Sequence, residues 1–351
     1  LLFVKRNLRN LRVSDWMTSP YPKEAVIKDE SQKPKIVPSE KSILLFPGQG
    51  TIKVGMIHKY LRYPNVKELF DIASEILNYN LLKICTDGPQ EKLNDTQFNQ
   101  VATVVSSLAA LEKLREERPR VLESCVAAVG YSVGEITSLI FSGAMSYEDG
   151  VRLVNMRGRA MKYASEKAKQ GMMSVYCTPQ AKVSEACKNA QKWALDLGVE
   201  NPVCLVAIYL YTQSKILAGN EEALKYIEKN KEKYSLAKLQ RLPVSGAFHT
   251  PLMEPALKSV ARLLDTIDLE EPRCIVYSNY KAIPYTTVKT IKKLILRQIV
   301  RPVKWEQCIQ SVYNRPPGTP FPRTFDVGSS GRMTTILKLI NAKAADSCIP
   351  V

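Results

Sequence analysis

Gly130, Ser132 and Gly134 form a Gly-x-Ser-x-Gly pattern, which is typical of a nucleophilic serine on a sharp turn between a strand and a helix. The apolar run Cys125–Val129 before it is too short for a helix and predicts a strand, whereas Glu135–Phe141 after it is compatible with a helix. The flanking glycines lack the Cβ atoms that would clash in such a turn. Free N–H groups at the helix start favour negative charge developing near the serine. The pattern predicts a catalytic serine, and a tight structural turn is the alternative.

A serine hydroxyl needs a base to take its proton, and the sequence contains only two histidines. His58 lies beside a lysine and a tyrosine and is expected on the surface or at a helix end. His249 follows the apolar run Leu242–Phe248, which predicts a strand, and Pro251 after it can open a helix. Because sites in α/β sheets gather at strand ends, His249 is the favoured base. A base at a third position stays open.

Strand and helix patterns alternate along most of the chain. Further short apolar runs predict strands at Ser42–Phe46, Cys274–Ser278 and Thr324–Val327. Helical periodicity marks Val66–Leu77, Val101–Leu114, Tyr147–Ala164, Leu252–Leu264, Thr287–Val300 and Met333–Ile340. This alternation argues for an α/β fold with a parallel, hydrolase-like sheet covered on both faces.

Residues 166–241 show a different pattern of predicted strands and helices. Strands are predicted at Met172–Tyr176, Val203–Tyr209 and Lys215–Ala218, and helices at Gln180–Leu195 and Glu221–Lys231. Two strand-helix-strand units of this size suit a small ferredoxin-like α+β subdomain. We therefore expect a large α/β domain from residues 39–165 and 242–340, interrupted by a small subdomain at 166–241 and followed by a C-terminal tail at 341–351.

The first dozen residues carry basic and apolar side chains, and the first acidic residue is Asp15. A basic, acid-free, amphipathic start is the composition of a mitochondrial transit peptide. A tail without structure is the alternative. Because prolines and mixed charges follow, residues 1–38 are expected to be a presequence remnant and a linker.

The chain is strongly basic, with Lys+Arg 50 against Asp+Glu 34 and a net charge of +16. Nucleic acid, an anionic membrane or an acidic protein would all fit this charge as partners. Nucleic acid is the weaker option, because zinc-finger spacing and Arg/Gly repeats are missing. No apolar run is long enough for a membrane span. Eight cysteines without a CxxC pair are typical of free thiols in a reducing compartment.

Several separated motifs together resemble malonyl-coenzyme A:acyl carrier protein transacylases, and with the basic leader they look most like the animal mitochondrial members. The motifs are Phe46–Gly50, Gly130–Glu135, Asn155–Gly158, Gly246–His249 and Arg297–Ile299. The resemblance covers roughly residues 42–340, and the motifs follow the order of the family. Agreement of all these motifs is far more specific than the serine pattern alone.

The resemblance implies a role for each of several residues. Ser132 would be the acylated nucleophile, and His249 its general base and then its acid. The backbone N–H groups of Gln49 and Val133 would form an oxyanion hole. Gln298 matches the glutamine whose backbone carbonyl orients the histidine.

Two further residues would set the choice of acyl group. Arg157 would bind the malonyl carboxylate, because a planar guanidinium matches a carboxylate with two parallel hydrogen bonds. Only the motif distinguishes it from the nearby Arg152 and Arg159. Phe248 resembles the bulky wall of malonyl-selective relatives, with ordinary core packing as the alternative.

Some positions depart from the family pattern. Tyr131 stands where the family often has histidine, and Ile52 where a second glutamine is common. Val327–Gly331 replaces the usual Gly-Pro-Gly. The first two departures would affect rate or substrate breadth, but none removes a group that the mechanism needs.

The implied reaction is ping-pong transfer of malonyl from its coenzyme A thioester to the phosphopantetheine thiol of acyl carrier protein, for fatty acid synthesis in the mitochondrial matrix. No bound metal or cofactor is expected. Carrier proteins are acidic, so the basic surface fits docking, and we expect a monomer. One alternative is an α/β serine hydrolase or thioesterase with an acid such as Asp196. A basic protein that binds nucleic acid or membrane is another.

Overall fold

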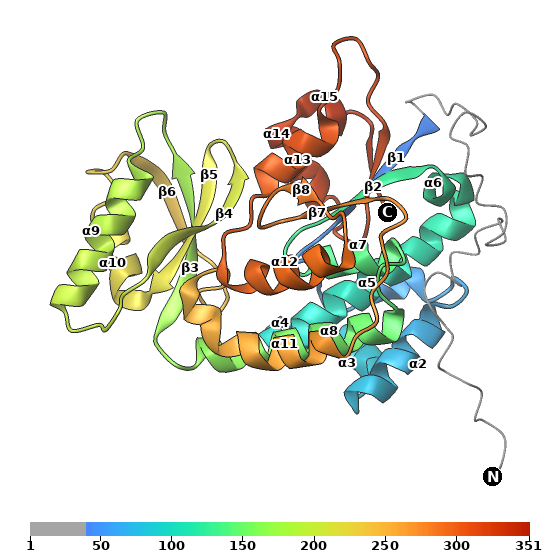
Figure 1. Ribbon diagram of the computed structural model, residues 1–351, viewed down its shortest axis with the longest axis horizontal. Coiled ribbons are helices and arrows are strands. Elements are labelled where there is room, and N and C mark those ends of the chain that lie inside the picture. The colour runs from blue at the N-terminus through green and yellow to red at the C-terminus, as the bar shows by residue number, and fades with distance from the viewer. Residues whose placement is uncertain (1–39) are drawn as a thin grey trace.

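The computed structural model describes residues 40–351 and contains two separate sheets (Figure 1). The larger sheet has the strand order β10-β9-β1-β2-β7-β8. Its strands are β1 (Ser42–Phe46), β2 (Cys125–Gly130), β7 (Ile275–Ser278), β8 (Ile283–Pro284), β9 (Arg323–Asp326) and β10 (Cys348–Pro350). All neighbouring pairs are parallel except β7 and β8. The sheet is therefore mixed and mainly parallel, as expected.

Helices cover both faces of this sheet. They are the 3₁₀ helices η5 (Met56–Tyr60) and η6 (Pro251–Ala256), and α2 (Val66–Leu77), α3 (Leu81–Asp87), α4 (Gln90–Asn94), α5 (Thr96–Glu117), α6 (Pro119–Glu123), α7 (Gly134–Phe141), α8 (Tyr147–Ser165), α11 (Leu257–Asp265), α12 (Val288–Val300), α13 (Trp305–Tyr313), α14 (Arg332–Ile340) and α15 (Ala342–Ala345). In Figure 1, α13, α14 and α15 lie on one side of the strands, and α5, α7 and α8 on the other. Because both faces are covered, the strands β1 and β2 are continuous apolar runs.

Helix α5 lies at the centre of the helical layer and is buried over most of its circumference. It packs against α8, α7 and α2. Its start is capped by Asp95, whose side chain accepts a hydrogen bond from the N–H of Gln97. Asn99 and Gln100 are buried polar residues in its first turns. Polar side chains buried in an otherwise apolar helix require partners, and these partners lie in the site described below.

The smaller sheet is antiparallel and has the strand order β4-β5-β3-β6. Its elements are β3 (Gln170–Cys177), α9 (Val183–Asp196), β4 (Cys204–Tyr211), β5 (Ser214–Asn220), α10 (Glu221–Lys229) and β6 (Leu236–Arg241). This βαββαβ order confirms the ferredoxin-like prediction. The two helices and the sheet enclose a second hydrophobic core, separate from the main one. We propose that residues 166–241 form the small subdomain and that the remaining described residues form the large one.

The smaller sheet meets the larger domain along β4. The backbone of Val303 exchanges hydrogen bonds with Ala207 and Tyr209, which makes a parallel bridge at Ile208. β4 also packs against α13. In Figure 1 the smaller sheet, in yellow and green, stands beside the larger domain at this junction.

Two predictions were wrong. The run Leu242–Phe248 is not a strand: Pro243 has no N–H to donate, and the segment forms a loop that becomes buried only from Gly246 onward. Residues 341–351 are not a tail, because they form α15 and β10 and complete one edge of the sheet. The C-terminal Val351 donates a backbone hydrogen bond to Asp326.

The predicted presequence and linker, residues 1–38, lie outside the described residues. None of the helices in residues 40–351 is long and apolar enough to cross a membrane. The eight cysteines carry no disulfide, in agreement with the prediction of free thiols.

Candidate active site

Ser132 lies on a sharp turn between β2 and α7, at the carboxyl end of the parallel strands. Its φ of 54° is in the left-handed region, which non-glycine residues rarely adopt. A Cβ on Gly130 would lie 1.8 Å from the carbonyl oxygen of Gly134, and one on Gly134 would lie 2.5 Å from that of Pro47. Only glycine fits at either position. The turn therefore has the geometry that the Gly-x-Ser-x-Gly pattern predicts.

His249 lies next to this serine, although 117 positions separate them in the sequence. Its Nε2 is 2.8 Å from Ser132 Oγ, and its Nδ1 is 2.7 Å from the backbone oxygen of Gln298. A carbonyl can only accept, so Nδ1 carries the proton and Nε2 is free to accept one from the serine. His58, by contrast, is exposed on η5.

The environment of His249 keeps its imidazole neutral. Burial, together with the nearby positive charge of Arg157, lowers the pKa of His249 to about 3, and the hydrogen bond to Gln298 offsets only part of this. The backbone of His249 has a φ of 62°, so both members of the pair are held in a left-handed conformation. Strained backbone at two adjacent side chains is typical of functional sites.

Arg157 is buried beside the pair, with an exposure of 1%. Its Nη1 donates to Gln100 Oε1 at 2.5 Å, and its Nη2 donates to Gln298 Oε1 at 2.8 Å and lies 3.4 Å from Ser132 Oγ. Burial lowers the pKa of Arg157 to about 10, so the group stays charged at neutral pH. Within residues 40–351 it forms no ion pair with a carboxylate. A buried cation held only by neutral oxygens is suited to bind an anion.

The other two arginines of α8 do not take part. Arg152 is exposed and paired with Asp149 at 2.9 Å, and Arg159 is exposed. With 3.6 residues per turn, both point away from the face that carries Arg157. Of the three arginines, Arg157 alone is buried beside Ser132.

Two backbone N–H groups near Ser132 are available. Within the described part of the chain, those of Gln49 and Val133 donate to no protein acceptor, whereas that of Ser132 donates to Asn279 Oδ1. Val133 precedes the first residue of α7, where N–H groups lack partners inside the helix. The family resemblance implies an oxyanion hole formed by these two N–H groups.

Gln298 connects most of the site, using its side chain as well as its backbone. The backbone oxygen accepts from His249, and Oε1 accepts from Arg157. Nε2 donates to the backbone oxygen of Ser132 at 2.9 Å and to Glu135 Oε2 at 2.7 Å. The resemblance predicted only the backbone contact, so the side-chain contacts are additional.

Glu135 is a fully buried carboxylate in the first turn of α7. It accepts hydrogen bonds from Gln298, from the backbone N–H of Asn279 and from the hydroxyl of Tyr285. Burial raises the pKa of Glu135 to about 7, although these donors and the charge of Arg157 counteract the shift. The carboxylate joins α7, α12 and the segment after β7 behind the serine.

Comparison with known proteins identifies the family. A family profile described as "Acyl transferase domain" matches residues 43–320, which is most of the chain. The chain belongs to the acyl transferases. Among solved structures, the malonyl CoA-acyl carrier protein transacylase of Coxiella burnetii is similar, with a TM-score of 0.79 and 26% identity over 90% of this chain and 95% of that one.

Curated relatives of this acyl transferase cover nearly its whole length. A Homo sapiens protein named "Malonyl-CoA-acyl carrier protein transacylase, mitochondrial" is 45% identical over 88% of this chain and 79% of its own. A Drosophila melanogaster protein, "Probable malonyl-CoA-acyl carrier protein transacylase, mitochondrial", is 47% identical over 92% of this chain and 85% of its own.

The remaining predicted positions of the acyl transferase are also placed. Phe248 is buried, and its ring lies 2.4 Å from where a Cβ of Gly246 would be, so the glycine is needed for the ring to fit. Tyr131 packs edge-on against Trp305. Ile52 is buried in the main core. Asp196, the acid suggested for a hydrolase triad, is exposed at the end of α9, and the partner of His249 Nδ1 is a carbonyl instead.

Sequence reasoning missed four residues of the site, namely Gln100, Asn279, Glu135 and Tyr285. Glu135 lies at the end of the Gly130–Glu135 motif, which predicts no role for it. Gln100 was detectable as a polar residue at the edge of the apolar helix α5. Asn279 and Tyr285 come after the apolar strand β7, but nothing in their spacing indicates that Asn279 contacts Ser132 or that Tyr285 contacts Glu135. Their roles depend on how β7 pairs with β2.

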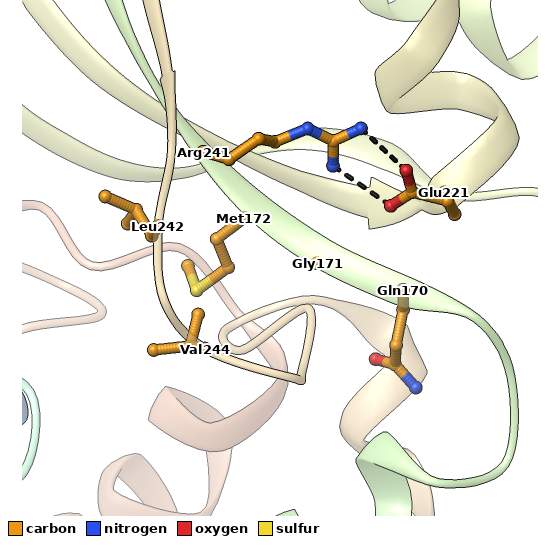
Figure 2. Close-up of a pocket in the computed structure, with 7 residues that line it drawn as sticks. All are labelled: Gln170, Gly171, Met172, Glu221, Arg241, Leu242 and Val244. Atoms are coloured by element: carbon orange, nitrogen blue, oxygen red, sulfur yellow. Dashed lines mark hydrogen bonds and ion pairs between the residues drawn. The ribbon is translucent and has the colours of Figure 1, made fainter. Parts of the chain in front are cut away.

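A pocket of 220 Å³ lies elsewhere, where the chain enters and leaves the smaller sheet (Figure 2). Arg241 and Glu221 form a two-point ion pair on its wall, with distances of 2.9 and 3.1 Å. Glu228 also accepts from Arg241, at 2.7 Å. Because two carboxylates already neutralise the arginine, the cluster joins β6 to α10 and is not suited to bind an anion.

Proposed function

We propose that this acyl transferase moves a malonyl group from malonyl-coenzyme A to the thiol of acyl carrier protein through an ester on Ser132. The observation that carries this proposal is the buried Arg157, which has no carboxylate partner among residues 40–351 and lies 3.4 Å from the serine oxygen. Malonyl has a free carboxylate one carbon beyond the thioester carbonyl. An arginine beside the nucleophile is therefore where that carboxylate would lie during attack. The names of the curated relatives agree with this substrate.

In the first half-reaction, Ser132 Oγ attacks the thioester carbonyl while His249 Nε2 takes its proton. The C–S bond then breaks, and the coenzyme A thiolate leaves with the proton from His249. The developing oxyanion accepts hydrogen bonds from the N–H groups of Gln49 and Val133. In the second half-reaction the carrier-protein thiol attacks the ester by the reverse sequence and regenerates Ser132.

The carboxylate of the substrate has a second consequence for the base. Burial and, after it, the charge of Arg157 lower the pKa of His249, which makes the protonated imidazole costly. A malonyl carboxylate bound to Arg157 would neutralise that charge and so stabilise the imidazolium in the transition state. Malonyl would then be favoured in the chemical step as well as in binding.

The setting of the enzyme follows from its relatives and its charge. The curated relatives are named mitochondrial, and we propose the mitochondrial matrix as the site of action, in fatty acid synthesis. The net charge of +16 supports docking of an acidic carrier protein. We propose that the enzyme acts as a monomer and without a bound cofactor, since every step uses a side chain or backbone group already named.

Intact-mass analysis after mixing with malonyl-coenzyme A tests the nucleophile. The parent chain should gain one malonyl group, and Ser132→Ala should gain none. Ser138→Ala is the matched control, because Ser138 lies in α7 and hydrogen-bonds only within that helix. An adduct that persists on Ser132→Ala would refute the proposed nucleophile.

The same incubation with acyl carrier protein present distinguishes transfer from hydrolysis. A transferase should deliver the malonyl group to the phosphopantetheine thiol. A hydrolase or thioesterase would release free malonate and leave the carrier protein unmodified. The second outcome would overturn the proposed function while leaving Ser132 as the nucleophile.

A further inference from the structure

We propose that Asn279 is a positioning residue that holds the nucleophile turn in its reactive shape. This inference rests on the proposed acyl transfer through Ser132. Asn279 lies in none of the motifs that indicated the family. It follows the last residue of β7 and is fully buried.

The side chain of Asn279 bridges the two ends of the turn. Its Oδ1 accepts a hydrogen bond from the N–H of Ser132 at 2.6 Å, and its Nδ2 donates to the carbonyl oxygen of Gly130 at 2.8 Å. One amide group therefore fixes the backbone on both sides of Tyr131. The φ of 54° at Ser132 costs free energy and persists only where neighbouring groups hold it.

Asn279 is itself held by its backbone. Its N–H donates to Glu135 Oε2 at 2.9 Å, and its carbonyl oxygen accepts from the N–H of Lys304 at 2.7 Å. With the two side-chain contacts, every polar group of Asn279 has a partner. Asn279 follows β7, which pairs with β2 in parallel, so its position relative to Gly130 is set by the sheet. Such a rigid support is what a reacting group requires.

This arrangement also determines which N–H groups remain for the reaction. The N–H of Ser132 is occupied by Asn279, while the neighbouring N–H of Val133 has no protein acceptor in the described residues. Without the side chain of Asn279, the N–H of Ser132 would be free and the turn would relax from its strained shape. Both changes would shift Ser132 Oγ relative to His249. The proposed substrate groups Arg157 and Gln49 are not among the partners of Asn279, so binding should change less than the chemical step.

The experiment compares Asn279→Ala with Asn220→Ala. Asn220 is also buried and accepts a hydrogen bond from a backbone N–H, that of Val203 at 2.7 Å, but it lies in the smaller sheet. In single-turnover acylation with malonyl-coenzyme A, Asn279→Ala should be about 100-fold slower, the cost typical of a misplaced reacting group. The substrate concentration for half-maximal rate should change less than about threefold. Asn220→Ala should keep the parental rate even where its melting temperature falls.

A second variant covers the case in which Asn279→Ala does not fold. Asn279→Asp has the same shape and keeps an acceptor for the N–H of Ser132, but it places an oxygen where Nδ2 donates to Gly130. It should also acylate at least about tenfold more slowly at pH 8. A folded Asn279→Asp or Asn279→Ala that acylates within about threefold of the parent chain would overturn the proposal. Equal slowing in Asn220→Ala would overturn it as well, because general loosening would then be the cause.

A fluorophosphonate probe separates this proposal from the proposed function. The probe forms an Oγ–P bond with an activated serine and releases fluoride, whatever acyl group the enzyme prefers. If the parent chain reacts with the probe but not with malonyl-coenzyme A, the proposed substrate is wrong. The labelling rate of Asn279→Ala still decides the role of Asn279: about 100-fold slowing supports it, and a parental rate contradicts it.

Discussion

The chemistry of this site depends on three side chains whose charges are set by burial. His249 is kept neutral, Arg157 keeps its charge without a carboxylate partner in the described part of the chain, and Glu135 is also buried. A buried cation that is only hydrogen-bonded to amide oxygens is a costly arrangement for folding. An anionic substrate that binds Arg157 would offset the free-energy cost of burying this cation. Selectivity for malonyl should therefore depend on a single guanidinium.

Replacing Arg157 tests whether selectivity for malonyl depends on its guanidinium. Arg157→Ala should lower kcat/KM for malonyl-coenzyme A by roughly 100-fold or more, because charge-assisted hydrogen bonds to a carboxylate are lost. The kcat/KM for acetyl-coenzyme A, which has no such carboxylate, should fall far less. Steady-state kinetics with both substrates measures the ratio of kcat/KM for malonyl-coenzyme A to kcat/KM for acetyl-coenzyme A.

Arg152→Ala provides the matched control for that substitution. It removes an arginine from the same helix, but one that is exposed and paired with Asp149. Its substrate preference should equal that of the parent chain. A preference for malonyl that survives in Arg157→Ala would remove Arg157 from the site.

At the scale of elements, the loop that carries His249 must be held without a strand ladder. Gln170, at the start of β3, supplies one link. Its Nε2 donates to the carbonyl oxygen of Ala164 at 3.0 Å, and its Oε1 accepts from the N–H of Ala247 at 2.9 Å. It therefore joins the end of α8 to the segment two residues before His249. Figure 2 shows the same side chain beside the pocket at this junction.

Gln170→Ala should destabilise the protein and slow acylation together. Two buried backbone groups lose their partners, which costs about 2–5 kcal/mol in the free energy of unfolding. Urea denaturation and the single-turnover acylation rate measure the two effects. Gln191→Ala is the control, because the side chain of Gln191 makes one hydrogen bond, from α9 to the carbonyl oxygen of Cys204 in β4, far from His249 in the sequence. It should cost less stability and leave acylation unchanged, whereas parental behaviour of Gln170→Ala would disprove the link.

At the scale of the whole molecule, the positive charge concerns the encounter with partners. The sequence carries a net charge of +16, and an acidic carrier protein would be attracted to it over distances comparable to the Debye length. Surface charge has little to do with the buried reaction centre. Salt should therefore affect association with the carrier protein more than the attack on the ester.

Transfer from the malonyl-enzyme to carrier protein should show this dependence. Raising the ionic strength from about 0.05 to about 0.5 M should lower kcat/KM for carrier protein by roughly tenfold. Transfer to free pantetheine, a thiol without charge, should change little over the same range. Equal salt dependence for the two acceptors would show that steering by the surface charge plays no part.

Local patterns in the sequence predicted most of the elements and indicated Ser132 as the candidate nucleophile. The strand, the glycines and the helix around Ser132 are contiguous, so their geometry follows from local sterics, and helix α2 begins and ends where its periodicity indicates. The two errors in strand prediction, at Leu242–Phe248 and at β6, arise because strand formation depends on a partner strand that local patterns do not reveal. An apolar run such as Leu242–Phe248 becomes a strand only if a partner strand is beside it, and β6, with alternating polar residues at the edge of its sheet, gave too weak a signal to be predicted.

Only the tertiary structure decided which distant groups meet at the serine. Pairing of β2 with β7 brings Asn279 to Gly130 and Ser132, and packing of α12 against η6 brings Gln298 to His249. Burial then selects Arg157 from three arginines on one helix and shifts the pKa of His249. These properties depend on separations in space and on the exclusion of water, and neither is encoded in the spacing of residues along a chain.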